Sequence, residues 1–100
     1  MNLCNICDEI SVIVEKLSYG QISFEYDNLM SAMKLGHPAD ILDDILALVA
    51  WDVFTGNTPE REKVDQMLRE LKKFKRFFKI KELNSVIKDL TLYLEGLEND

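Results

Sequence analysis

Few residues in this sequence have the type and spacing that chemistry requires, and the first of them are two cysteines. Cys4 and Cys7 form a C-x-x-C pair, the spacing found in one half of many tetrahedral zinc sites. A structural zinc needs four ligands, and the single histidine, His37, supplies only a third. A redox C-x-x-C needs a βαβ context, which the sequence does not offer. We therefore expect no metal, and two reduced thiols on a helix with Cys7 on its buried side.

Other candidate chemical groups also lack the partners they would need. His37 lies in a Gly-His-Pro turn, and no nucleophile or carboxylate is specified beside it, as a catalytic base requires. Asp40, Asp43 and Asp44 could give oxygen ligands to Mg²⁺, although acids near a helix start are also explained by the helix dipole. The sequence contains no Gly-rich phosphate loop and no G-x-S-x-G elbow. We expect a protein that is not an enzyme, with no catalytic residue, cofactor or metal.

A basic run at residues 72–81 is the pattern closest to a nucleic-acid interface. Six of its ten residues are Lys or Arg, and three phenylalanines lie among them. However, Phe74 and Phe78 continue the apolar stripe of one helix, which predicts that they belong to the core. The cations suit the C-terminal end of that helix. We expect a solvated face here and no nucleic-acid partner.

The charge distribution favours a basic protein as partner. The net charge is −6. Residues 1–57 hold nine acids and two lysines, a net of −7, whereas residues 58–100 hold nine acids and ten bases, a net of +1. An acidic half repels nucleic acid and anionic membranes and attracts cationic surfaces. With no basic region or uninterrupted apolar stretch at the N-terminus and no apolar run longer than seven residues, we expect a cytoplasmic protein without a signal peptide or membrane span.

The elements that position these residues are predicted to be helices. Apolar residues recur at helical spacing along the whole chain, which predicts a single all-α domain, a bundle of four or five helices. The expected helices cover residues 2–17, 23–36 and 38–54, followed by two helices that separate near residues 80–85. The alternative for this last part is one continuous helix of nearly forty residues, because no Gly or Pro lies between Pro59 and Gly96. Thr58 and Pro59 are the expected cap and first residue of the fourth helix. Asn84 or Ser85 is the expected cap of the fifth.

The outer face of the helix expected at 38–54 is the most informative surface. Opposite the apolar arc of this helix lie the candidate partner-binding residues Asp40, Asp43, Asp44, Trp51 and Phe54. Aromatic side chains supply binding energy at interfaces, and charges steer association. The alternative is that the helix is covered on both sides, with Trp51 and Phe54 in the core. Asp52 falls inside the apolar arc, so it needs a partner or a position where the helix emerges into water.

Two further segments bear on function, namely the turn Leu-Ser-Tyr-Gly-Gln-Ile-Ser at 17–23 and the acidic-apolar block Asp-Ile-Leu-Asp-Asp-Ile-Leu at 40–46. With these two segments the chain resembles bacterial immunity proteins, which protect a cell from contact-dependent or bacteriocin-like toxins. The resemblance implies a non-enzymatic inhibitor that binds and blocks a toxin domain, often a nuclease. Nucleases carry basic clefts for phosphate, which a small acidic protein can occupy.

A second hypothesis is a helical regulatory or adaptor module that forms a homodimer or docks a partner helix. It would use apolar residues that the predicted stripes leave over, namely Val12, Phe77, Ile80 and Leu92.

Overall fold

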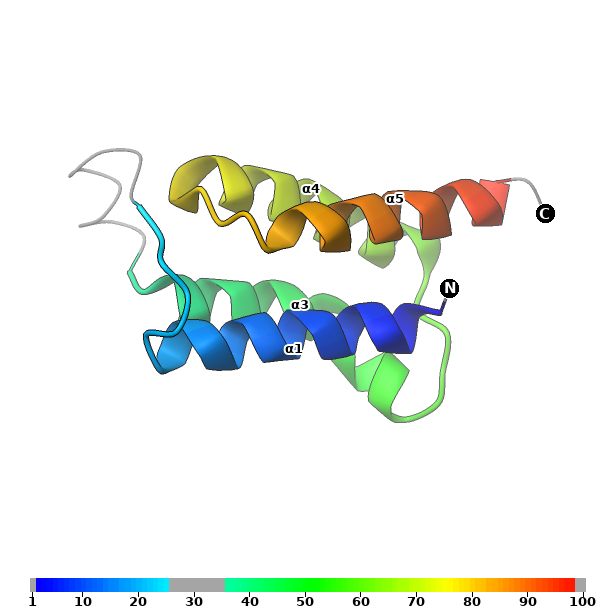
Figure 1. Ribbon diagram of the computed structural model, residues 1–100. Coiled ribbons are helices and arrows are strands. Elements are labelled where there is room, and N and C mark those ends of the chain that lie inside the picture. The colour runs from blue at the N-terminus through cyan, green and yellow to red at the C-terminus, as the bar shows by residue number, and fades with distance from the viewer. Residues whose placement is uncertain (1, 26–35, 99–100) are drawn as a thin grey trace.

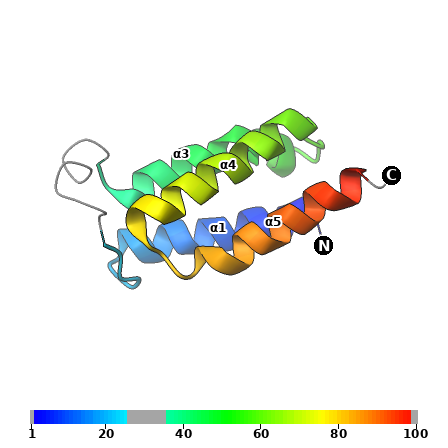
Figure 2. The same cartoon turned by 90° about the horizontal axis from the view of Figure 1, so that it is seen from above.

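The computed structural model describes residues 2–25 and 36–98, which form four helices and no strand (Figure 1). The helices are α1 (Leu3–Ser18), α3 (Pro38–Phe54), α4 (Arg61–Phe78) and α5 (Leu83–Glu98). Figures 1 and 2 together show a square arrangement, with α1 beside α3, α3 beside α4, α4 beside α5, and α5 beside α1. The predicted all-α bundle is confirmed.

The first and third predicted helices are confirmed almost to the residue. The side chain of Asn2 caps α1 by accepting a hydrogen bond from the Asn5 N–H at 2.9 Å. After α1, Gly20 turns the chain with a φ of +69°, a conformation that glycine adopts without strain. α3 begins at Pro38 and ends at Phe54, as predicted.

The histidine has a structural role at the start of α3. His37 is the N-cap, and its Nδ1 accepts a hydrogen bond from the Ala39 N–H at 3.1 Å. Its ring also contacts Phe24 edge-on, with the centroids 5.7 Å apart. One of the backbone donors that a helix start leaves unpaired is thereby satisfied.

Loss of this cap is expected to destabilise the fold modestly. We predict that His37→Ala lowers the free energy of unfolding by about 1 kcal/mol, because the Ala39 N–H loses its acceptor. His37→Asn is the control, since it removes the ring contact with Phe24 but restores a side-chain acceptor. Urea denaturation followed by circular dichroism measures both variants. Equal losses in the two variants would assign the effect to the ring and not to the cap.

The predicted start of α4 is wrong by two residues. α4 begins at Arg61, and its N-cap is Glu60, which makes no side-chain capping bond. The Glu60 carbonyl accepts from the N–H groups of Lys63 and Val64, at 3.0 and 3.3 Å. Pro59 is buried in the turn, so this residue packs as part of the connection and does not open the helix.

The predicted break between the last two helices is confirmed, although its predicted caps are wrong. Lys79 ends α4 in the left-handed conformation, with a φ of 50°, and α5 begins at Leu83, before Asn84 and Ser85. The N–H groups of Leu83 and Asn84 donate to the turn carbonyls of residues 80 and 81, which satisfies two of the backbone donors at the start of α5. Ile80, which the adaptor hypothesis would use for docking, is fully buried in this turn and is not available to a partner.

The predicted second helix does not start at Ser23. Residues 23–25 are not helical, and the Glu25 N–H donates instead to the Phe78 carbonyl at 3.1 Å. The ring of Phe24 meets that of Phe78 edge-on, at 6.4 Å between centroids. Contact with the end of α4 therefore determines the backbone here, and the remainder of the predicted helix, residues 26–35, lies outside the described residues.

The core is apolar and draws on all four helices. Among the described residues, no charged or polar side chain is buried. Phe74 and Phe78 are buried as predicted, with ring centroids 4.7 Å apart. Asp65 and Arg69, one turn apart on α4, form an ion pair on the surface at 3.4 Å, where such pairs contribute little stability. None of the four described helices is both long and apolar enough to cross a membrane.

Candidate protein-binding surface

The outer face of α3 exposes all five residues that the sequence pattern assigned to partner binding. This surface, called here the α3 face, consists of Asp40, Asp43, Asp44, Trp51 and Phe54. At 100° per residue the five positions fall within about 100° of the helix circumference, along roughly 21 Å of its axis. The structure therefore brings them together on one continuous strip.

Burial of the opposite side of α3 explains why this strip faces outward. Leu42, Ile45, Leu46 and Val49 are buried and fix the rotation of the helix about its axis. The alternative that α3 is covered on both sides is wrong, because Trp51 is 78% exposed and Phe54 is 60% exposed.

The α3 face has two chemically different halves. The three carboxylates are exposed and occupy its N-terminal half, and within the described part of the chain none of them has an ion-pair partner. Trp51 and Phe54 are one turn apart at the C-terminal half. The small exposed side chain of Ala47 lies between the halves, so a partner could contact both without a bulky obstacle.

Asp52, the anomalous acid of the apolar arc, has a partner from another helix. Its carboxylate is half-buried, and Lys63 Nζ of α4 lies 3.8 Å from Oδ2. This pair joins α3 to the start of α4 and leaves Asp52 out of the α3 face.

Most of the aromatic side chains of the basic run at residues 72–81 pack in the core and are not on the surface. Phe74 and Phe78 are buried and Phe77 is half-buried, whereas the cations of residues 72–81 are exposed except for the half-buried Lys75. Other exposed large apolar side chains lie outside the α3 face, on or beside α1 and α5. The sequence pattern did not indicate Tyr19, at 72% exposure, or Leu97, at 36%. For Tyr19 the position at the C-cap of α1, off the apolar stripe, was the available signal.

The two cysteines differ in environment. Both thiols are free, Cys4 exposed and Cys7 buried. Burial, with smaller contributions from Cys4 and Asp8, raises the pKa of the Cys7 thiol from 9.0 to about 11. No cluster of three His, Cys, Asp or Glu side chains that could hold a metal occurs among the described residues.

We predict selective alkylation of the native protein and a loss of stability in alkali. Iodoacetamide at pH 8 should add one group, at Cys4, and a second only after denaturation, because Cys7 is buried and protonated. The raised folded-state pKa means that the unfolded state releases this proton first, so stability should fall as pH rises from about 9 towards 11. Mass spectrometry and urea melts measure the two effects. Cys7→Ala is the control, and an unchanged alkaline slope in this variant would assign the loss to other groups.

Comparison with known proteins adds no relative: no family model, no curated protein and no solved structure matches this chain.

Proposed function

We propose that this protein binds a basic partner protein through the α3 face and acts by occupying the partner's surface, without catalysis. The observation that carries the proposal is the exposure of Trp51 and Phe54 on the same helix face. Each large aromatic side chain can bury about 150–250 Å², and such residues dominate the energy of many interfaces. Because Trp51 and Phe54 are not buried within this protein, a partner can bury them and gain the free energy of that burial.

The carboxylates of the α3 face define the partner's chemistry. Asp40, Asp43 and Asp44 would attract a surface rich in Lys and Arg and speed its association. A nucleic-acid-cleaving domain has such a surface in its phosphate-binding cleft. The resemblance of residues 17–23 and 40–46 to immunity proteins gives the finer form of the proposal, a cytoplasmic inhibitor that protects the cell from a toxin nuclease.

Charge removal tests the proposal. A photo-crosslinking amino acid in place of Asp43, which is exposed on the α3 face and leaves Trp51 intact, should capture the partner, whereas the same amino acid at Glu15, on the exposed side of α1, should not. With the captured partner purified, Asp40→Asn combined with Asp44→Asn should slow association by about tenfold and flatten its salt dependence. The dissociation rate should change less.

A matched charge change provides the control. Glu15→Gln combined with Glu95→Gln removes the same two charges from exposed positions on other helices. If this control slows association as much as the α3 variant does, net charge and not the α3 face governs encounter. If neither changes the rate, the carboxylates of the α3 face do not steer this partner, and the charge part of the proposal is wrong.

A further inference from the structure

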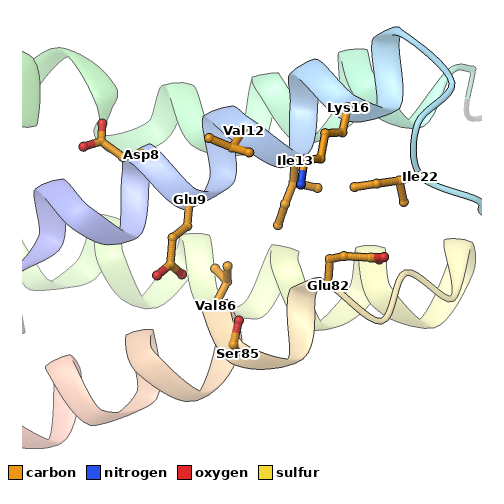
Figure 3. Close-up of a pocket in the computed structure, with 9 residues that line it drawn as sticks. All are labelled: Asp8, Glu9, Val12, Ile13, Lys16, Ile22, Glu82, Ser85 and Val86. Atoms are coloured by element: carbon orange, nitrogen blue, oxygen red, sulfur yellow. The ribbon is translucent and has the colours of Figure 1, made fainter.

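A groove of about 440 Å³ lies between α1 and α5, on helices that do not form the α3 face (Figure 3). α1 supplies one wall, and the start of α5 with the residue before it supplies the other. Ile22, from the segment after α1, reaches the groove at one end. The groove follows the seam between the first and last helices of the square.

The floor of the groove is apolar and its wall carries an exposed aliphatic side chain. Ile13, Ile22 and Val86 are buried, at 6%, 7% and 1% exposure, and face the seam in Figure 3. Val12 beside them is 48% exposed, although it lies next to an apolar floor that could bury it. Val12 therefore extends the apolar lining of the groove from its floor onto an exposed wall.

The rim of the groove is acidic. Asp8 and Glu9 on α1 and Glu82 before α5 oppose a single cation, Lys16, which gives a net charge of −2. All four side chains are exposed, and none is in an ion pair within the described ranges 2–25 and 36–98. Ser85 is the remaining polar residue of the lining.

From these observations we infer that the α1–α5 groove binds an amphipathic, cationic helix of a partner protein. The aliphatic residues of that helix, spaced at i, i+3 and i+4, would cover Val12 and the apolar floor. Lys or Arg residues flanking the apolar stripe would meet Asp8 and Glu9 on one wall and Glu82 on the other. Two helices that run side by side present ridges and a groove into which a further helix packs.

A set of synthetic peptides tests this inference on the intact protein. The probe is a Leu/Lys peptide of about 15 residues with its leucines on one helical face. One control peptide has Glu in place of Lys, and the other has Ser in place of Leu. Titration calorimetry should show binding of the probe and of neither control. Methyl resonances of Ile13, Ile22 and Val86 should shift during the titration.

Two variants with matched exposure locate the binding site. Val12→Lys should weaken binding at least about tenfold, since it places a cation on the apolar wall. Leu92→Lys makes the same change at a 50% exposed position of α5 outside the groove lining and should leave binding unchanged. Glu9→Lys should weaken binding by a similar factor through charge alone. Thermal melts should show that all three proteins remain folded.

The remaining outcomes separate this inference from the proposed function. A protein carrying Asp40→Asn, Asp44→Asn and Trp51→Ala should bind the probe as wild type does, because the groove does not include the α3 face. Loss of probe binding in that protein would overturn the inference and assign the peptide to the α3 face. Equal binding of the Ser-for-Leu peptide would also overturn it, as would a concentration-dependent dimer that Val12→Lys abolishes, since the groove would then be occupied by a second copy.

Discussion

Replacement of Phe78 by alanine is expected to lower the free energy of unfolding by about 3–5 kcal/mol. The side chain is 1% exposed, and its ring contacts those of Phe74 and Phe24, at 4.7 and 6.4 Å between centroids. It lies where the end of α4 meets the segment after α1. Truncation therefore leaves a cavity at a three-way junction. Since a domain of this kind is stable by about 5–15 kcal/mol, the loss is a large fraction of the total.

The neighbouring residue is the natural control for this prediction. Phe77→Ala removes the same side chain from a half-buried position on α4, and the loss should be clearly smaller. Far-ultraviolet circular dichroism in urea is the appropriate measurement, because the exposed Trp51 makes fluorescence a poor reporter of unfolding. Equal destabilisation by the two substitutions would show that the core does not centre on Phe78 as described.

Replacement of Trp51 by alanine is expected to have the opposite profile, with a large loss of binding and almost none of stability. With 78% of the side chain exposed, truncation should change the unfolding free energy by no more than about 0.5 kcal/mol. If Trp51 anchors the partner, its loss should cost about 2–4 kcal/mol of binding, which is roughly a 30- to 900-fold faster dissociation. Surface plasmon resonance with the captured partner measures this rate.

Tyr19 offers a matched comparison for Trp51. Tyr19 is an aromatic residue of similar exposure, 72%, at the end of α1 and outside the α3 face. Tyr19→Ala should leave both dissociation and stability unchanged. A partner that dissociates from the Trp51 variant at the wild-type rate would contradict the proposed interface. A Trp51 variant that melts early would contradict the exposure on which the proposal rests.

Helical periodicity was sufficient to predict the bundle, since each apolar stripe faces the common core. It could not predict details set by tertiary contacts. Pro59 has the sequence signature of a first helical residue. In the structure it is buried in the turn, and α4 begins two residues later, at Arg61. Ile80 lies off the periodic stripe and is buried because a left-handed residue, Lys79, redirects the chain towards the core.

The sequence was sufficient to predict which residues make up the α3 face, but not whether solvent or another helix covers that face. Plotting α3 as a helix places Trp51 and the acids on one side, yet it does not say whether another helix covers that side. The α1–α5 groove was beyond prediction for a different reason. Its lining joins Val12 to Val86, and no local pattern records that residues so far apart in the chain share a seam.

The square order of the helices has a kinetic consequence. In the described ranges, α1 packs on α3, α3 on α4 and α4 on α5, so three of the four main helix pairs are neighbours in the order of the described helices. The fourth main pair, α1 with α5, closes over the length of the chain. Short loop closures cost little entropy and favour fast folding. The α1–α5 seam carries the largest closure cost, so it should form last in folding and open first in native-state fluctuations. A helix that docks in the α1–α5 groove should hold this seam closed. It should therefore slow amide-proton exchange in α1 and α5 more than it slows exchange in α3.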